Sequence, residues 1–433
     1  PGNYKDIKTA QSTFMSFKTI SVVGLGYIGL PTAAVLASEK TNVVGVDVNP
    51  QTVDIINRGE IHIVEPCLAQ KVAEAVAGGY LRASATPQPA DAFLIAVPTP
   101  FRSEYQPELS YVRAAAESVA AVLKKGDLII LESTCPVGTT GQMAGWLAAL
   151  RPDLMFPQHS EQPDIHIAYC PERVLPGKIM SELVNNDRVI GGMTPACSAR
   201  ARQLYQLFVH GECIVTDDRT AEMCKLTENS FRDVNIAFAN ELSMICHEQQ
   251  INVWQLIDLA NRHPRVNILQ PGPGVGGHCI AVDPWFIVAQ NPQQSRLIRT
   301  AREVNDSKPG WVMDQVKQQL ADCLNATSQR ASEITIACFG LAFKADIDDL
   351  RESPALNVVQ MISRWHQGQV LAVEPNITQL PSSLAGEVTL ADSETALQQA
   401  DILVLLVDHR QFKTIDPQRL AGRRVVDTRG LWK

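Results

Sequence analysis

The stretch that most constrains the fold is a glycine turn between an apolar run and a helical pattern. Residues 18–26 read KTISVVGLG, residues 27–40 read YIGLPTAAVLASEK with apolar residues at helical spacing, and residues 41–49 read TNVVGVDVN. Strand, glycine turn, helix and strand within about thirty residues form the βαβ unit of a parallel sheet. The sequence therefore predicts an α/β fold that begins with a Rossmann-type, doubly wound sheet.

The turn itself predicts a dinucleotide site. Gly24, Gly26 and Gly29 have the G-x-G-x-x-G spacing, and Asp47 ends the second strand. In such turns the first glycine permits the bend, the second lets the backbone approach a pyrophosphate, and the third lets the helix pack on the strand. An acid at Asp47 would bind the ribose hydroxyls and disfavour a 2′-phosphate, which predicts NAD. The alternative is a glycine turn in an unrelated α/β protein.

The remaining patterns divide the chain. Apolar strands alternate with helices up to residue 217, long helical patterns follow, and strands return after residue 332. Continuous apolar strands between helices indicate parallel sheets with both faces covered. We predict a non-native remnant at 1–14, a Rossmann domain at 15–217, a helical segment at 218–325 and a smaller Rossmann-like α/β domain at 326–433.

Composition and charge bound the partners and the compartment. The net charge of −8, from 38 basic and 46 acidic residues, argues against a nucleic-acid partner. No apolar run approaches the length of a membrane span, and no secretory signal is recognisable. The 10 cysteines contain no C-x-x-C pair, which favours reduced thiols in the cytoplasm.

Polar residues follow several strands of the first domain. Thr99 lies in VPTP, Thr134 in ESTCPVGTT, and Glu172 and Arg173 in YCPERVLPGK. Ligands of doubly wound sheets bind at the carboxyl ends of the strands, so these side chains are candidates for cofactor or substrate contacts. Glu172 could act as a base or orient a water. Turn chemistry and a surface ion pair are the alternatives.

A polar stripe occupies the long helical pattern at residues 219–250. Lys225, Asn229 and Arg232 fall at i, i+4 and i+7 and therefore share one face. Two cations around an amide suit an oxyanion or a sugar phosphate. We expect Leu226, Phe238 and Leu242 to form a core on the opposite side. A solvated charged face is the alternative.

The stretch PGPGVGGHCIAVDPWF, residues 271–286, is too rich in glycine and proline to predict regular helix or strand. Bare backbone N–H groups around Cys279 would favour the thiolate, the reactive form of the side chain. A plain buried thiol is the alternative. Metal binding is not expected, because no other Cys or His has ligand spacing to His278 and Cys279. Further on, Phe343, Lys344 and Arg351 follow a strand end and suit phosphate binding or an ion-paired surface loop.

Taken together, GLGYIGLP, VPTP, the S-T-x-P-V-G-T run, PERVLPG, the K-L-x-E-N-x-F helix, GGHC and FGLAFKADIDDLRESP resemble the UDP-glucose/GDP-mannose dehydrogenase family. The resemblance spans the chain in order and implies an NAD-dependent, four-electron oxidation of a sugar-nucleotide alcohol to a carboxylate. It implies UDP-N-acetyl-D-mannosamine as the substrate, with UDP-N-acetylglucosamine or UDP-glucose as alternatives. UDP-glucose dehydrogenases typically have Lys-Asp where this chain has Val282-Asp283, which weakens the last alternative. The family also implies a homodimer or higher oligomer through the helical segment, and UDP-sugar binding by the last domain.

The resemblance assigns roles residue by residue. It implies that Cys279 is the nucleophile, assisted by Lys225, Glu172 and Asp283. The implied NAD contacts, besides the three glycines, are Tyr27, Ile28, Asp47, Thr99, Thr134 and Arg351. The implied substrate contacts, besides Lys225, are Arg173, Val174, Asn229, Arg232, Gly276, Phe343, Lys344, Arg429 and, toward a neighbouring subunit, His263 and Arg265. His278 receives no catalytic role.

Two other classes of protein are compatible with parts of the pattern. A two-electron β-hydroxyacid dehydrogenase also places a Rossmann domain before helices, but it needs neither a thiol nor a second α/β domain. A non-catalytic NAD-binding regulator would leave Cys279 and Lys225 without a purpose.

Overall fold

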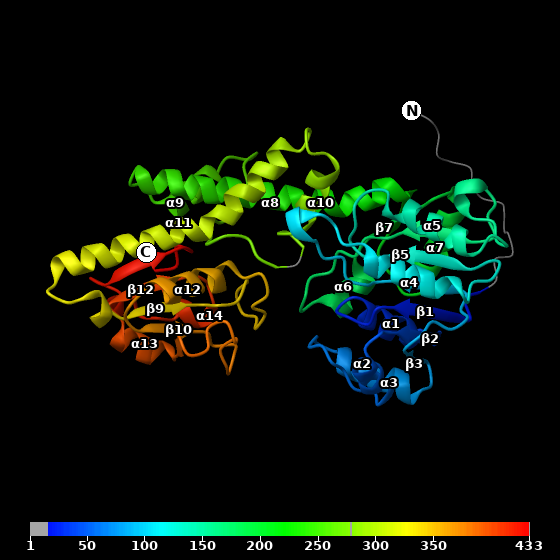
Figure 1. Cartoon of the computed structure of the whole chain (residues 1–433), viewed down its shortest axis with the longest axis horizontal. Helices are drawn as coiled ribbons and strands as arrows, with labels where there is room; N and C mark the ends of the chain where they lie inside the picture. Colours follow the sequence, from blue (N-terminus) through cyan, green and yellow to red (C-terminus); the bar gives the residue numbers. More distant parts are fainter. Residues whose placement is uncertain (1–15, 278, 433) are drawn as a thin grey trace. The chain divides into compact units, whose positions relative to one another are not determined.

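The computed structural model describes residues 16–277 and 279–432 (Figure 1). The predicted remnant at 1–14 and His278 lie outside these residues. The chain forms two compact units that divide between Lys225 and Leu226. The division falls within one helix, α8 (Asp218–Glu248).

The first unit is built on an eight-stranded sheet within the described residues. Its strand order is β3-β2-β1-β4-β5-β6-β7-β8, with every neighbouring pair parallel except β6 and β7. The strands are β1 (Thr19–Val23), β2 (Asn42–Val46), β3 (Leu81–Ser84), β4 (Ala92–Ile95), β5 (Leu128–Leu131), β6 (His166–Tyr169), β7 (Arg188–Gly192) and β8 (Cys213–Asp217).

Helices cover both faces of this sheet. They are α1 (Gly29–Ser38), α2 (Pro50–Asn57), α3 (Leu68–Ala77), α4 (Ser110–Ala120), α5 (Thr139–Leu150), α6 (Ile179–Asn185) and α7 (Pro195–Tyr205). Successive strand residues enter opposite cores: Val22 packs in the cluster that includes α1, α3, α6 and α7, whereas Val23 packs in the cluster that includes α4 and α5. Burial on both faces explains the continuous apolar strands of the sequence.

The second unit combines helices with a smaller parallel sheet. The sheet order is β11-β10-β9-β12-β13. Besides residues 226–248 of α8, its helices and strands are α9 (Val253–Ala260), α10 (Asp283–Gln290), α11 (Arg296–Ala326), β9 (Ile336–Phe339), α12 (Pro354–Trp365), β10 (Val370–Val373), β11 (Thr389–Leu390), α13 (Ser393–Gln399), β12 (Ile402–Leu405), α14 (Arg410–Lys413) and β13 (Arg424–Asp427). Val312, Val316 and Leu320 of α11 share a core with β9 and α12. The helical segment and the smaller sheet are therefore packed as one body.

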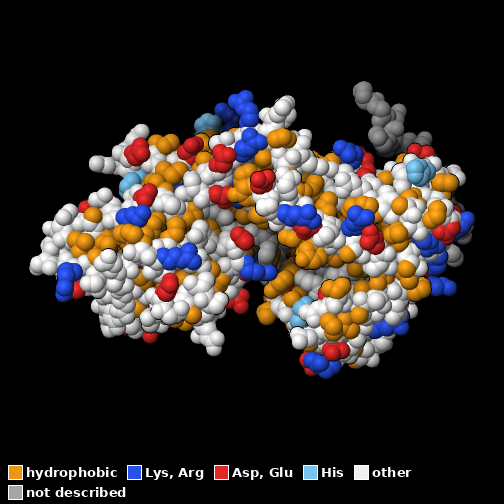
Figure 2. All heavy atoms as spheres, viewed as in Figure 1, with side chains coloured by type: hydrophobic (Ala, Val, Ile, Leu, Met, Phe, Trp, Pro, Cys, Tyr) orange, Lys and Arg blue, Asp and Glu red, His pale blue; other side chains and the backbone are white. Residues whose placement is uncertain are grey.

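The predicted fold class is confirmed, and two local expectations are wrong. The breaker-rich stretch 271–286 becomes helical at Asp283, because Pro284 lies in the first turn of α10, where a missing N–H costs no helical bond. Phe238 is 55 % exposed rather than part of a core, although Leu226 is buried. On the face shown in Figure 2, acidic and basic side chains are interspersed with apolar ones, and neither sign of charge dominates.

Candidate active site

In the glycine turn of the first unit, each of the three positions favours glycine for a different structural reason. Gly24 has φ of 95°, and a Cβ there would lie 2.6 Å from the carbonyl oxygen of Ala96. A Cβ on Gly29 would lie 1.7 Å from the carbonyl oxygen of Gly24, so only glycine lets α1 approach β1. No atom lies within 4 Å of a Cβ built on Gly26. Gly26 therefore leaves one side of the turn open, as a pyrophosphate requires.

Asp47 is joined to the glycine turn. Its Oδ2 accepts a hydrogen bond from the Leu25 N–H at 3.1 Å, and its Oδ1 accepts one from the Asn49 N–H at 2.9 Å. Tyr27, which is exposed, and Ile28 lie directly before α1. The carboxylate is thus oriented beside the turn and remains partly exposed, where it can accept bonds from ribose hydroxyls.

Thr99 and Thr134 come together at the carboxyl ends of β4 and β5. The Thr99 hydroxyl donates a hydrogen bond to the carbonyl oxygen of Thr134. The neighbouring Ser133 hydroxyl donates to the carbonyl oxygen of Val97 at 2.7 Å. The two strand ends that the sequence singled out are therefore linked to each other directly.

Glu172 belongs to a buried ion pair and not to a surface one. Arg188 Nη1 lies 2.8 Å from Glu172 Oε2, and both side chains are buried. Burial alone would lower the pKa of Arg188, but the adjacent Glu172 carboxylate raises it above its ordinary value. Beside this pair, burial raises the pKa of Glu132 to about 7, and the Tyr205 hydroxyl donates to Glu132 at 2.6 Å. Glu172 is thereby fixed in orientation by a partner that the sequence did not reveal.

The segment after Glu172 is held by residues that the sequence analysis missed. Arg173 donates from Nη2 to the carbonyl oxygen of Asp187 at 2.7 Å, and Val174 packs against the core of the first unit. Glu65 accepts hydrogen bonds from the N–H groups of Gly177 and Ile179 at 2.9 and 2.8 Å. The Glu65 carboxylate thus caps α6 and fixes the end of the PERVLPG segment.

The polar stripe of α8 is present. Lys225 and Asn229 are partly buried and Arg232 is exposed, all on this one helix. Asn229 Nδ2 donates to Asp283 Oδ2 at 2.5 Å. This bond brings two predicted site residues from separate segments into contact and orients the Asp283 carboxylate.

The loop that carries Cys279 packs tightly against the second α/β segment. A Cβ on Gly276 would lie 2.4 Å from the carbonyl oxygen of Glu352 and 3.0 Å from Cβ of Phe343. A Cβ on Gly277 would lie 3.2 Å from the Phe343 ring. The glycines therefore allow Phe343 to lie directly under the loop.

Cys279 itself is exposed, at the start of a turn into α10. Its carbonyl oxygen accepts hydrogen bonds from the N–H groups of Val282 and Asp283 at 3.1 and 2.8 Å. Burial raises the pKa of the Cys170 and Cys338 thiols to about 12, which makes those thiols unreactive. Exposure distinguishes Cys279 from such structural cysteines.

A buried polar network holds the cysteine loop on both sides of Cys279. Before it, the Gly272 N–H donates to Asn240 Oδ1 at 2.9 Å, and Lys308 Nζ donates to the Gly272 carbonyl at 3.1 Å. After it, Arg302 Nη1 donates to the Ala281 carbonyl at 2.8 Å. Burial, with the nearby Arg429 charge, lowers the pKa of Lys308 to about 7.

The same network continues between α8 and α11. Arg302 pairs with Asp233 at 2.9 Å, and Asn305 donates to Asp233 Oδ1 and accepts from Asn240, both at 2.8 Å. Sequence analysis missed these residues. Their signal was a stripe of polar side chains at spacings of three and seven on helices that also carry apolar faces.

The remaining predicted residues lie in the second unit. Arg429 lies beside the cysteine loop: a Cβ on Gly272 would be 2.8 Å from its Nη1. Arg351 forms a 2.6 Å ion pair with Asp349, and Lys344 is exposed. His263 and Arg265 are exposed after α9, and the Arg265 N–H donates to the His263 ring at 3.3 Å. Their expected contact with a neighbouring subunit stays a prediction.

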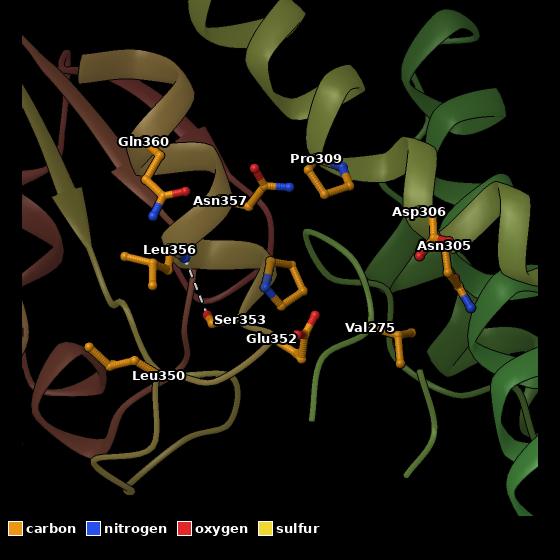
Figure 3. A pocket seen from close by; sticks show the side chains of 11 residues that line it. Val275, Asn305, Asp306, Pro309, Leu350, Glu352, Ser353, Leu356, Asn357 and Gln360 are labelled. Carbon is orange, nitrogen blue, oxygen red and sulfur yellow. Dashed lines mark hydrogen bonds between the residues drawn. The ribbon is translucent and has the colours of Figure 1, made fainter. Parts of the chain in front are cut away.

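A pocket of about 300 Å³ lies beside the cysteine loop, within the second unit (Figure 3). Carboxylates and amides from α11, α12 and the preceding loop line it: Asn305, Asp306, Glu352, Asn357 and Gln360. Val275 and Glu352 border the pocket, next to the predicted site residues Gly276 and Arg351 in the chain. None of the predicted site residues is among those that line it.

In the part of the chain that the structure describes, no helix is both long and apolar enough to cross a membrane. Within residues 16–277 and 279–432, no three His, Cys, Asp or Glu side chains are grouped so that they could hold a metal ion.

Comparison with known proteins decides the family. Residues 18–209 match the NAD binding domain, residues 219–307 the central domain and residues 337–433 the UDP binding domain of UDP-glucose/GDP-mannose dehydrogenases. The chain belongs to the UDP-glucose/GDP-mannose dehydrogenase family. The resemblance inferred from the sequence motifs is confirmed, and the protein is an NAD-dependent dehydrogenase.

Relatives within this dehydrogenase family differ in the sugar that their names specify. The chain is 70 % identical to a UDP-N-acetyl-D-mannosamine dehydrogenase of Salmonella typhi, over 97 % of this chain and 100 % of the relative. It is 65 % identical to an NDP-N-acetyl-D-galactosaminuronic acid dehydrogenase of Ralstonia nicotianae, over 96 % and 97 %. Among solved structures, a UDP-D-ManNAc dehydrogenase from Pyrococcus horikoshii has a TM-score of 0.85 at 38 % identity, with 96 % of each chain covered.

Proposed function

We propose that this dehydrogenase oxidises C6 of UDP-N-acetyl-D-mannosamine to the carboxylate, through a covalent bond to Cys279. The observation that carries the chemistry is the exposed Cys279 in a loop that hydrogen bonds hold on both sides. The 70 % identity to a UDP-N-acetyl-D-mannosamine dehydrogenase along its full length supports the sugar. The product, a nucleotide-linked uronic acid, would enter bacterial surface polysaccharide.

The first unit fits the cofactor. Gly26 leaves the turn open to a pyrophosphate, and the partly exposed Asp47 carboxylate is oriented toward the same turn by the Leu25 N–H. NAD, when bound, accepts one hydride in each of the two oxidations. Thr99 and Thr134, linked at the strand ends, would contact the cofactor, and the contact expected of Arg351 stays a prediction.

The chain's own residues would carry the covalent steps. After the alcohol has lost a hydride and a proton, the Cys279 thiolate adds to the aldehyde and forms a thiohemiacetal. Loss of the second hydride and of the hydroxyl proton leaves a thioester, and water hydrolyses it to the carboxylate, a proton and the free thiol. Covalent capture divides a difficult four-electron oxidation into two similar steps.

The other site residues have distinct tasks in this scheme. Lys225 would stabilise the substrate oxygen or exchange a proton with it. Asp283, oriented by Asn229, and Glu172, oriented by Arg188, would activate water for hydrolysis of the thioester. Arg173, Arg232, Lys344 and Arg429 supply positive charge for the nucleotide phosphates.

We also propose a homodimer or higher oligomer in the cytoplasm. Phe231, Phe238 and Ile245 are 71 %, 55 % and 46 % exposed and recur every seventh residue along α8. Large apolar side chains aligned on one helix face favour a protein partner. Light scattering should report an oligomer for the wild-type chain and a smaller species for a Phe231→Ser, Phe238→Ser variant; a wild-type monomer would contradict the proposal.

A panel of nucleotide sugars tests the substrate. UDP-N-acetyl-D-mannosamine, UDP-N-acetylgalactosamine, UDP-N-acetylglucosamine and UDP-glucose are each offered with NAD, and kcat/KM is measured. We expect kcat/KM for the mannosamine compound to exceed the others by about tenfold or more. Preference for the galactosamine compound would favour the alternative that the Ralstonia relative suggests.

A further inference from the structure

The two sheets share one hydrogen-bonding arrangement at the end of the strand that comes first in the chain. In the first unit, the Gly24 N–H donates to the Val46 carbonyl at 2.8 Å, and the Leu25 N–H donates to Asp47. In the second, the Gly340 N–H donates to the Val373 carbonyl at 2.8 Å, and the Leu341 N–H donates to Glu374 at 2.8 Å.

The geometry around each glycine supports this correspondence. Gly24 and Gly340 have φ of 95° and 102°. Each follows a strand that lies between two parallel partners, β1 between β2 and β4, and β9 between β10 and β12. Glu374 therefore stands in the second sheet where Asp47 stands in the first.

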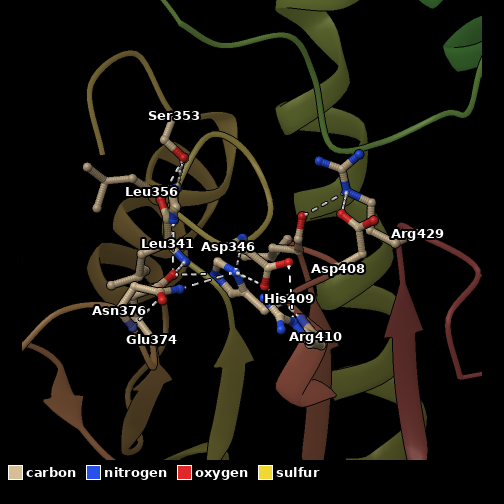
Figure 4. Close-up of polar contacts among 12 residues, drawn as sticks. Leu341, Asp346, Ser353, Leu356, Glu374, Asn376, Asp408, His409, Arg410 and Arg429 are labelled. Atoms are coloured by element: carbon tan, nitrogen blue, oxygen red, sulfur yellow. Dashed lines mark hydrogen bonds and ion pairs between the residues drawn. The ribbon is translucent and has the colours of Figure 1, made fainter. Parts of the chain in front are cut away.

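Glu374 differs from Asp47 because its carboxylate is buried and is hydrogen-bonded to groups of the protein itself. It is buried, and its Oε2 accepts from the N–H groups of Leu341 and Ala342, at 2.8 and 3.2 Å, and lies 2.8 Å from His409 Nε2 (Figure 4). Its Oε1 accepts from the backbone and side-chain nitrogens of Asn376, both at 3.1 Å. Burial alone would raise the pKa of Glu374, but these hydrogen bonds hold it below its ordinary value. The Glu374 carboxylate therefore binds donors of the protein itself and not a ligand.

His409 connects Glu374 to the other end of the loop that begins with Leu341 and Ala342. The Asp346 N–H donates to His409 Nδ1 at 2.9 Å, so Nδ1 acts as an acceptor. Nε2 is then the donating nitrogen of the ring, and it donates to Glu374. The Arg410 N–H in turn donates to Asp346 Oδ1 at 2.9 Å. One buried pair consequently fixes both ends of the loop 341–346.

That loop carries Phe343, which lies under Gly276 and Gly277, and the exposed Lys344. Glu374 and His409 both follow strand ends, the edge of a parallel sheet at which ligands bind. We propose that Glu374 and His409 are positioning residues for the sugar nucleotide, which set Phe343 and Lys344 in place; this rests on the proposed function of the second unit in binding UDP.

Two conservative variants separate the bonds of this pair. Glu374→Gln removes the charge that gathers the loop N–H groups. His409→Asn keeps an acceptor near the Nδ1 position and removes the donor to Glu374. His366→Gln is the matched control, because His366 is also buried but bonds through Nε2 to the Ile334 carbonyl at 2.7 Å, before β9 begins.

Binding of UDP and of NAD is measured by calorimetry, with KM and kcat for the sugar nucleotide. We expect Glu374→Gln and His409→Asn to weaken UDP binding and raise the sugar-nucleotide KM by about tenfold, the size of one lost charge-assisted hydrogen bond. NAD binding and kcat at saturation should stay near the wild-type values. The His366→Gln variant should bind UDP normally even if its thermal midpoint falls equally.

Each other outcome decides against the proposal. UDP affinity that is unchanged in both variants, or lowered equally in His366→Gln, assigns the pair to stability alone. The same conclusion follows if neither variant can be purified folded. If the wild-type protein does not bind UDP, the proposed function itself fails, which is distinct from failure of the Glu374 variants.

Discussion

Lys308 donates a hydrogen bond from Nζ to the carbonyl oxygen of Gly272, within the loop that carries Cys279. A second bond joins the same Nζ to the Ser243 hydroxyl at 2.6 Å, and the ammonium lies 4.8 Å from the centre of the Trp311 ring. A buried lysine thus connects α11, α8 and the reactive loop. Its protonation should be visible in the stability of the whole protein.

Lys308→Met tests this connection through pH. Burial lowers the folded-state pKa of Lys308 to about 7, from 10.5. Between these values the unfolded chain binds a proton that the folded chain does not, so the stability of the wild-type protein rises with pH across this window. Relative to Lys308→Met, the wild-type free energy of unfolding should gain on the order of 1.5 kcal/mol from pH 7 to 8.5.

Denaturant unfolding at both pH values measures this difference. Lys317→Met, on an exposed part of the same helix, should show none of it. A Lys308→Met variant whose stability follows the wild-type pH dependence would show that Lys308 keeps an ordinary pKa.

Gly26→Ala and Gly29→Ala should affect different properties, NAD binding in the first variant and stability in the second. A Cβ on Gly26 meets no atom within 4 Å, so the protein should fold normally but bind NAD about tenfold more weakly, near 1.4 kcal/mol, since the methyl group occupies the approach of the pyrophosphate. A Cβ on Gly29 would lie 1.7 Å from a carbonyl oxygen, so stability should fall by ~3 kcal/mol or more. Calorimetric NAD binding and thermal unfolding distinguish the two. Equal NAD affinity in Gly26→Ala and wild type would place the pyrophosphate elsewhere.

The local parts of the fold were readable from the sequence because their causes are local. The turn 24–29 lies between an apolar strand and a helical pattern, and each glycine has a steric reason within the same βαβ unit. By contrast, β7 could not be predicted from the sequence. The strand β7 contains two adjacent glycines and pairs antiparallel with β6, so neither its residues nor its direction follows the pattern of the other strands.

The partners of the site residues could not be predicted, because they come from distant segments. Glu172 could be predicted as a candidate acid. Its partner Arg188 could not, because the two residues come together only when β7 pairs with β6. Asp233 and Arg302 look like surface charges on separate helices until those helices pack together. Phe238 shows the opposite error: an apolar residue at helical spacing suggests a core, although its face is exposed in the single chain.

Cys279→Ser should stop uronate release and leave nucleotide binding intact. The hydroxyl is a much weaker nucleophile than a thiolate and cannot form the thioester. The backbone bonds from Val282 and Asp283 to the carbonyl oxygen of residue 279 do not depend on the sulfur, so the turn should be retained. Mass spectrometry of the products, beside calorimetric binding of UDP and NAD, gives the result. Uronate production at the wild-type rate would remove Cys279 from the mechanism.

The central claim is a four-electron oxidation, and the ratio of NADH formed to sugar nucleotide consumed tests it most directly. Limiting UDP-N-acetyl-D-mannosamine is converted to completion with excess NAD, and NADH is measured by absorbance. A covalent two-step oxidation gives about two NADH for each uronate. One NADH per sugar, with an aldehyde as the product, would contradict the account.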